Sequence, residues 1–217
     1  MKEPLIKIRN LTKIYREQTV LDDITLDIQK GSCTGFVGNN GSGKTVLFKC
    51  ICGFVKPTKG YVEVGGKRIG RDTDFIEDTG IIIENPGFLG NITAYRNLEL
   101  LSSINNKIDR KRILSVLEQV GLKDEMNKKV KNYSLGMRQR LGIAQAIMEN
   151  PSMLILDEPF NGLDREVLTD MRDLVRNMNE EGTTVIISSH NSSDIELLCD
   201  RVIELDGGRM IDEKSTF

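Results

Sequence analysis

Apolar and polar positions alternate along the start of the chain, with interruptions at Asn10, Asp22, Asp23 and Gly31. The apolar positions are Leu5, Ile6, Ile8, Val20, Leu21, Ile24, Leu26 and Ile28. A period of two broken by turn-forming residues is typical of short antiparallel strands. An apolar strand is then predicted at 33–37, followed by a glycine-rich turn and a helix from Thr45 to about Cys52. The order strand, glycine-rich loop, helix is therefore expected near the start of the chain.

The spacing of apolar residues changes in the middle of the chain. After a turn at 57–60, strands are predicted at 61–64 and 80–83. From Asn91 to Asn150 the apolar residues recur with a helical period, at Leu98, Leu101 and Ile104, at Ile113, Val116, Leu117 and Val120, and at Leu141, Ala144, Ile147 and Met148. A mostly helical lobe is expected there.

Strands return at 153–156 and 184–188, on either side of a predicted helix from Asp164 to about Asn179. The apolar positions of this helix are Val167, Leu168, Met171, Leu174, Val175 and Met178. Strand, helix, strand order favours a parallel α/β core with helices on its faces. We expect a single domain over residues 1–217, with a core lobe of 1–84 and 151–217 and a helical lobe of about 85–150.

Composition narrows the class of protein. With 217 residues, 39% hydrophobic and 29% charged, the chain has the balance of an ordinary globular protein and can bury a core. It has no run of about 18 apolar residues and no signal-peptide pattern, so a membrane role is expected to come through a partner. The formal net charge of -2 gives no general attraction to nucleic acid, which is not expected as a partner. The four cysteines lack metal-finger spacing and are expected as buried thiols.

Residues 38–45 have the pattern of a phosphate-binding loop. The segment Gly38-Asn39-Asn40-Gly41-Ser42-Gly43-Lys44-Thr45 fits G-x-x-x-x-G-K-[ST], between a predicted strand and a helix that continues through Val46. Its glycines allow positive φ and close approach, so that successive N–H groups and the positive helix end face an anion. Lys44 supplies a charge for the β- and γ-phosphates, and the Thr45 hydroxyl suits Mg²⁺. Gly38 to Val46 are therefore the expected binding residues for a nucleotide with Mg²⁺.

A second apolar strand ends in two acids. Residues 153–156 are followed by Asp157 and Glu158, at the edge where ligands bind in open α/β sheets. Asp157 is expected to hold Mg²⁺ or its water, and Glu158 to polarise an attacking water. Alone, the pair is also typical of a strand that ends in a solvated acidic turn. Together with the phosphate loop it predicts a P-loop nucleoside triphosphatase.

Two further segments and two single residues resemble motifs of the ABC ATPase family, in the order of that family over nearly the whole chain. Ser134-Leu135-Gly136-Met137-Arg138-Gln139-Arg140 resembles the signature segment, although a serine N-cap before an amphipathic helix gives a similar pattern. Asn161-Gly162-Leu163-Asp164 resembles the D-loop, and His190 is similar to the switch histidine that contacts the γ-phosphate. Tyr15 resembles the aromatic residue that stacks on adenine.

The resemblance implies a P-loop α/β fold with a mixed RecA-like β-sheet core, an N-terminal antiparallel β subdomain and an inserted helical subdomain. It also implies a head-to-tail homodimer that depends on ATP, in which Ser134, Gly136, Met137 and Asp164 of one copy meet the nucleotide held by the other. Glu158, His190 and Lys44 are then the expected catalytic residues. ATP and Mg²⁺ are the implied cofactors.

Two positions depart from the usual family pattern. Glu84, in the segment Ile81-Ile82-Ile83-Glu84-Asn85-Pro86, stands where glutamine is usual, and Leu135-Gly136-Met137 replaces the usual second glycine pattern. Both variants resemble those of bacterial ATPases for bacitracin export and lantibiotic immunity. A carboxylate ligates Mg²⁺ as glutamine does, but it adds negative charge beside a triphosphate. Glu84 is expected as a metal ligand with Thr45 and Asp157.

The family resemblance implies ATP hydrolysis that drives a separate transmembrane permease subunit, from the cytoplasm at the inner face of the cell membrane. Export of an antimicrobial peptide or drug is the expected transport, and the sequence does not name the compound. Phe88, Leu89, Ile92 and Tyr95 are expected either to dock the membrane subunit or to pack within the helical lobe. A soluble ABC-type ATPase acting on a ribosome or DNA complex is the alternative function, although such proteins usually resemble two fused ATPase domains or carry long coiled coils.

Overall fold

The computed structural model describes residues 4–84 and 86–215. Its first sheet has four strands in the order β2, β1, β4, β5 and is antiparallel. These strands are β1 (Ile6–Tyr15), β2 (Gln18–Ile28), β4 (Lys59–Val64) and β5 (Lys67–Arg68). The expected antiparallel strands are confirmed, but β1 and β2 are 10 and 11 residues long rather than short. Register shifts between them absorb the interruptions at Asn10 and Asp23, which both adopt positive φ.

The second sheet has six strands in the order β10, β9, β3, β8, β7, β6. They are β3 (Cys33–Val37), β6 (Thr79–Ile82), β7 (Met153–Asp157), β8 (Thr184–Ser188), β9 (Arg201–Asp206) and β10 (Arg209–Ser215). All neighbours are parallel except β10, which pairs antiparallel with β9. The sheet is therefore mixed, as predicted, and the carboxyl ends of β3, β7 and β8 meet at one edge.

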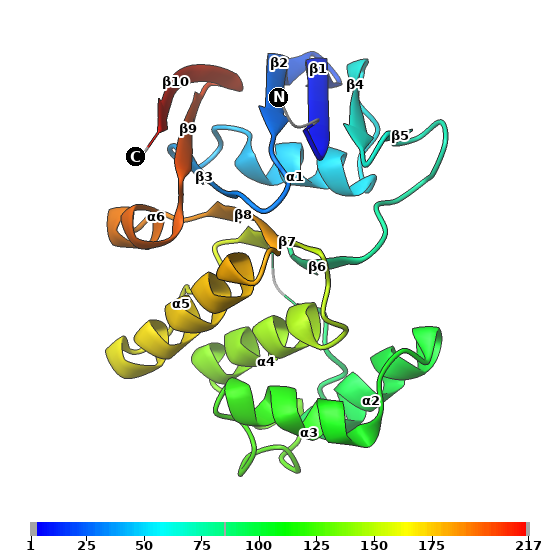
Figure 1. Cartoon of the computed structure of the whole chain (residues 1–217), viewed down its shortest axis with the longest axis vertical. Helices are drawn as coiled ribbons and strands as arrows, with labels where there is room; N and C mark the ends of the chain where they lie inside the picture. Colours follow the sequence, from blue (N-terminus) through cyan, green and yellow to red (C-terminus); the bar gives the residue numbers. More distant parts are fainter. Residues whose placement is uncertain (1–3, 85, 216–217) are drawn as a thin grey trace.

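Helices cover both faces of the six-stranded sheet (Figure 1). They are α1 (Lys44–Cys52), α2 (Ala94–Asn105), α3 (Arg110–Gln119), α4 (Leu135–Ile147), α5 (Arg165–Glu180) and α6 (Ser192–Leu198), with a 3-10 turn η1 at Val130–Asn132. Helix α1 packs between the two sheets, in contact with β2, β4 and β7. Helices α2 to α4 form the insertion between β6 and β7, and Figure 1 shows them on the other side of the sheet from α1.

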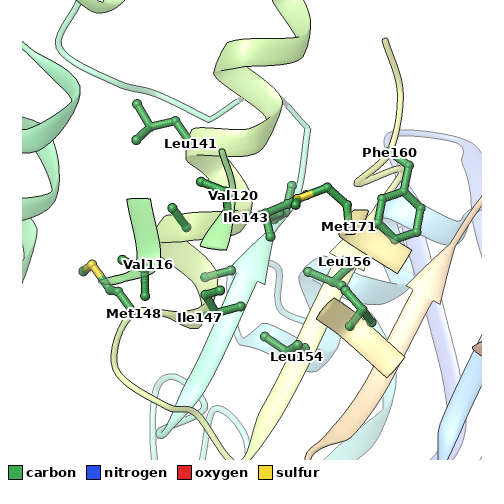
Figure 2. Packing of buried hydrophobic residues seen from close by; sticks show 14 of the residues in the cluster. Val116, Val120, Leu141, Ile143, Ile147, Met148, Leu154, Leu156, Phe160 and Met171 are labelled. Carbon is green, nitrogen blue, oxygen red and sulfur yellow. The ribbon is translucent and has the colours of Figure 1, made fainter. Parts of the chain in front are cut away.

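Alternate residues of β7 bury themselves in two separate cores. Leu154 and Leu156 join the cluster made with α3, α4 and α5, whose packing is shown in Figure 2. Met153 and Ile155 join the cluster made with α1 and the antiparallel sheet. Burying one such side chain stabilises the fold by about 1.5–3 kcal/mol. This two-sided burial holds β7, and with it the acids that follow, in a fixed position.

Several side chains differ from the expected pattern. Ile104, placed by periodicity among the apolar positions of the helical lobe, is 74% exposed, because α2 ends one residue later and its last turn extends past the core. Phe88 and Tyr95 pack against the helical cluster, as the packing alternative predicts, whereas Leu89 is 59% exposed. All four cysteines are free and buried, and burial raises the pKa of Cys50 to about 11 and that of Cys52 to about 12. None of the helices described is long and apolar enough to cross a membrane.

Candidate functional site

Glycines shape the loop that joins β3 to α1. Gly38, Gly41 and Gly43 have φ of 142°, 82° and 108°, in the left-handed region that disfavours a side chain. A Cβ at Gly38 would lie 2.1 Å from the carbonyl oxygen of Leu205, and one at Gly43 would lie 2.9 Å from that of Val20. The loop is therefore packed against backbone and can take this shape only with glycine at these two positions.

The Lys44 ammonium lies inside this loop. Its Nζ donates to the carbonyl oxygens of Gly38 at 2.6 Å and Asn39 at 3.2 Å, and the residue is 7% exposed. Burial lowers the pKa of Lys44, while the nearby Glu158 and Asp157 act in the opposite direction. Its third partner is the Ser42 hydroxyl, at 3.4 Å. A cation with only neutral partners is ready to bind an anion, because an ionised partner gives the stronger hydrogen bond.

Asp157 is held by two hydroxyl groups at the carboxyl end of β7. Thr45 Oγ1 donates to Asp157 Oδ2 at 2.6 Å, and Ser188 Oγ donates to Asp157 Oδ1 at 2.6 Å. Asp157 and Ser188 are register partners on adjacent parallel strands, which explains the second contact. The arrangement places the hard oxygens of Thr45 and Asp157 side by side at the first turn of α1, as a small hard cation requires.

Glu158 lies beside the histidine. His190 Nε2 is 3.1 Å from Glu158 Oε1, and the His190 backbone N–H donates to Glu158 Oε2 at 3.2 Å. Glu158 has φ of 52° and its backbone N–H donates to the Ser188 carbonyl oxygen at 3.2 Å, so the turn after β7 is fixed in an uncommon conformation. Burial raises the pKa of Glu158, and the His190 contact opposes that shift.

The Oε1 atom of Glu158 is buried, and its contact with His190 Nε2 lacks the alignment of a hydrogen bond. It therefore keeps acceptor capacity for the hydrogen of a water molecule. These groups surround a hollow of about 180 Å³, lined by Val20, Asn40, Gly41, Ser42, Gly43, Lys44, Thr45, Val46, Asp157, Glu158 and His190. The structure thus brings the predicted phosphate loop, both acids and the histidine together.

The signature and D-loop residues lie in a different hollow, of about 230 Å³, which Ser134, Gly136, Met137 and Asp164 help to line. Ser134 is the N-cap of α4 and accepts from the Met137 N–H at 3.2 Å, while Asp164 is the N-cap of α5. The N-cap interpretation of Ser134 is therefore correct as local structure, and it leaves the signature role open. A Cβ at Gly136 would lie 2.9 Å from the Gly162 carbonyl oxygen, so the two segments pack closely.

Tyr15 and Glu84 line neither hollow. Tyr15, at the end of β1, is 43% exposed, with Lys13 Nζ 4.7 Å from its ring centroid. Glu84 has φ of 60° and pairs with Lys49 of α1, Nζ to Oε1 at 2.7 Å. In residues 4–84 and 86–215, no three or more His, Cys, Asp or Glu side chains gather to hold a metal. Asn85 of the quoted segment lies outside the described residues.

Sequence reasoning assigned no role to Ser188 or Lys49, which contact Asp157 and Glu84. A signal existed for Ser188, because it ends an apolar strand as Asp157 does, and parallel neighbours end at the same edge. Lys49 lies four residues after Thr45 on α1, but the sequence gives no means of placing Glu84 opposite it.

A glycine loop between a parallel strand and a helix, with acids at the end of a neighbouring strand, defines a P-loop nucleotide-binding protein. The family model described as "ABC transporter" matches residues 21–161. The chain belongs to the ABC transporter family and is an ATP-binding, ATP-hydrolysing subunit of a transporter.

Curated relatives agree with this assignment. An uncharacterized ABC transporter ATP-binding protein, YdbJ of Bacillus subtilis, is 43% identical over 99% of this chain and 70% of its own length. The bacitracin transport ATP-binding protein BcrA of Enterococcus faecalis is 41% identical over 97% of this chain and 69% of its own length. The lantibiotic transport ATP-binding protein SrtF of Streptococcus pyogenes is 37% identical over 97% of this chain and 90% of its own length.

The fold is also similar to solved structures. A dimeric post-hydrolysis state of an ATP-binding cassette bound to ADP and Pi superposes with a TM-score of 0.89 at 26% identity, over 98% of this chain and 99% of that one. The predicted fold class and membership of the ABC family are therefore confirmed.

Proposed function

We propose that this subunit powers the export of an antimicrobial peptide or drug through a separate membrane subunit, from the cytoplasmic face of the membrane. The support for this transport class is the similarity to bacitracin and lantibiotic transport proteins, together with Glu84 in place of the usual glutamine. The assignment of ATP hydrolysis to this site is supported by one observation. Four side chains line the same hollow: Lys44, Asp157, Glu158 and His190.

ATP binds with its phosphates in the loop of residues 38–46. The positive-φ glycines direct backbone N–H groups at the phosphates, and Lys44 exchanges its carbonyl partners for the β- and γ-phosphate oxygens. The adenine stacks on Tyr15, whose exposed ring already carries a cation contact on one face. Stacking of this kind uses only the face of the ring and needs no specific hydrogen bond to the base.

The residues present fit Mg²⁺, because Thr45 Oγ1 and Asp157 Oδ2 are two hard oxygens 2.6 Å apart at the phosphate end of α1. When bound, the ion neutralises charge on the β- and γ-phosphates. Asp157 holds the ion or its water, and Ser188 keeps that carboxylate in place. Glu84 joins this set only after leaving Lys49. An exposed ion pair is worth about 0–1 kcal/mol and therefore does not prevent the move.

Glu158 orients the attacking water and accepts its proton. Its Oε1 has acceptor capacity left, and a pKa raised by burial makes it a better base than an exposed carboxylate. His190 holds this carboxylate through its backbone N–H and presents its ring toward the γ-phosphate. Proton transfer from water to Glu158 lets the oxygen attack phosphorus while ADP leaves.

A second copy closes the site in a head-to-tail homodimer. The hollow of Ser134, Gly136, Met137 and Asp164 is separate from the phosphate loop of its own chain, so it is free to meet the nucleotide of a partner. The N-terminus of α4 there suits a phosphate oxygen. Bound ATP then forms part of the interface, and its hydrolysis removes that part.

The membrane subunit docks at a cleft of about 650 Å³ beside β6, between α1's end and the helical lobe. Phe54 and Ile104, which are 52% and 74% exposed, lie on its wall, as does Pro86, two residues after Glu84. Exposed apolar groups around a cleft favour a protein partner. The Glu84 segment thereby links the docking surface to α1 and its phosphate loop.

The test is Glu158→Gln, which keeps shape and hydrogen bonding but removes the base. Steady-state ATPase should fall by about 10²–10⁴-fold, the usual contribution of a general base, while ATP affinity stays unchanged and an ATP-bound dimer accumulates in size-exclusion chromatography. Glu166→Gln, an acid in the first turn of α5 and outside both hollows, is the matched control. Undiminished turnover in Glu158→Gln would exclude the assigned role.

A further inference from the structure

A buried polar network lies behind the His190 loop, and the proposed chemistry does not use it. Asp194 of α6 is 2% exposed. Arg172 of α5 donates to its Oδ1 from Nε at 2.7 Å and also from an Nη2 group. Ser189 Oγ donates to its other oxygen, Oδ2. Both carboxylate oxygens are therefore bonded inside the protein.

Burial makes this network hard to disturb. The Arg172 side chain is 14% exposed and that of Asp194 is 4% exposed. A charge at that depth is tolerated only when it is paired and hydrogen-bonded, and removal of one partner is strongly destabilising. Asp194 is consequently a fixed point, at which α6 is tied to α5.

Ser189 connects this fixed point to the catalytic pair. Its hydroxyl donates to Asp194 and accepts from the Asn191 backbone N–H at 3.1 Å. His190 lies in the chain between Ser189 and Asn191. Its backbone N–H donates to Glu158 Oε2, and its ring Nε2 is 3.1 Å from Glu158 Oε1. The backbone on both sides of His190 is thus held by one buried hydroxyl.

We propose that Asp194, with Arg172, is a positioning residue for hydrolysis: it fixes the Ser189 hydroxyl and so aligns His190 with Glu158. This inference rests on the proposed roles of Glu158 and His190. When a catalytic group on a loop is displaced by about one ångström, the rate of the chemical step falls even if the nucleotide still binds. The network provides the rigidity that such a loop requires.

Ser189→Ala is the informative variant because it cuts the link but leaves the Arg172 and Asp194 ion pair intact. We expect kcat for ATP hydrolysis to fall on the order of ten- to hundred-fold, with the Kd for ATP unchanged by calorimetry.

A double-mutant comparison separates positioning from a general structural effect. In a His190→Ala background, Ser189→Ala should cause no further loss, because its effect passes through His190. Ser193→Ala is the matched control, because Ser193 is an exposed serine in the first turn of α6. This variant should behave as the unmodified protein. Asp194→Asn, assayed below its unfolding temperature, should reproduce the Ser189→Ala kinetics.

His190 is the one histidine in the sequence, so its imidazole NMR signals report the alignment directly. They should move in Ser189→Ala and in Glu158→Gln but not in Ser193→Ala. Unchanged signals and unchanged kcat in Ser189→Ala would overturn the inference, as would an equal loss with and without His190. If Glu158→Gln and His190→Ala themselves hydrolyse ATP normally, the proposed function fails instead.

Discussion

Thr45 donates its hydroxyl hydrogen to Asp157 across 2.6 Å, which joins the first turn of α1 to the end of β7. The contact connects residues 112 positions apart in the chain, on two elements that share the core cluster formed with the antiparallel sheet. Because both groups are oxygen ligands of the kind that Mg²⁺ prefers, the pair is preorganised for the ion.

Thr45→Val should therefore remove the gain in ATP affinity that Mg²⁺ provides, while affinity in the presence of EDTA stays near that of the unmodified protein. Thr45→Ser keeps the hydroxyl and should retain most of the gain. Calorimetric titration with and without Mg²⁺ measures both. A Thr45→Val protein that still binds more tightly with Mg²⁺ would remove Thr45 from the proposed metal site.

Lys44→Ala should weaken ATP binding about ten- to hundred-fold, because a hydrogen bond to a charged group contributes about 1.5–3 kcal/mol. The loop should largely keep its shape although the Lys44 contact with the Gly38 carbonyl is lost, since Gly38 and Gly43 remain packed against the Leu205 and Val20 carbonyls. Lys30→Ala, at an exposed position, serves as the control. Equal ATP affinities for the two variants would contradict the proposed phosphate contact.

Glu158→Gln should make the nucleotide-free protein more stable at pH 8. Burial raises the pKa of Glu158 above its ordinary value of 4.5, so the folded state binds this proton more tightly than the unfolded chain does. That contribution is complete below about pH 4.5 and is lost as pH rises through the folded pKa, where the buried carboxylate ionises at a cost. Gln has no such cost.

The stability difference between Glu158→Gln and the unmodified protein should consequently shrink as pH falls from 8 toward 4.5. Urea unfolding followed by circular dichroism over this range measures it. A variant that is less stable than the unmodified protein at pH 8, or a difference that grows toward acid pH, would show that the carboxylate is stabilised rather than strained.

Ile104→Glu should impair assembly with the membrane subunit without unfolding the chain, because the side chain is 74% exposed at the wall of the cleft. Leu89→Glu, at 59% exposure, tests the docking segment predicted from sequence in the same way. Leu197→Glu, at a position on α6 that is 53% exposed, is the control. Co-purification of the membrane subunit from membranes measures assembly. Intact complexes with Ile104→Glu would exclude the cleft as the docking site.

Local chemistry made the phosphate loop, Asp157 and the strand edges predictable. The G-x-x-x-x-G-K-[ST] spacing predicts a phosphate-binding loop between a strand and a helix. An apolar strand before two acids predicts carboxylates at the edge of the sheet. The hairpin of β9 and β10 was missed although its signal was present: Gly207 and Gly208 both have positive φ, as a tight two-residue hairpin turn needs.

Contacts between residues far apart in the chain could not be predicted from the sequence. Glu84 was expected at the metal, but nothing in its neighbours along the chain reveals Lys49 across from it. Asp194 likewise reads as an ordinary acid in a helix's first turn. Only the folded structure shows that Arg172, 22 residues earlier, neutralises it.

Helix α5 has a further consequence for how two copies cooperate. Its N-cap, Asp164, lines the hollow proposed to receive the partner's nucleotide, and Arg172 lies eight residues along the same rod, about 12 Å at 1.5 Å per residue. In the proposed dimer, a displacement of the first turn of α5 is therefore expected to reach Arg172, and through Asp194 the loop that carries His190. We expect hydrolysis at one site to depend on whether the other site is occupied.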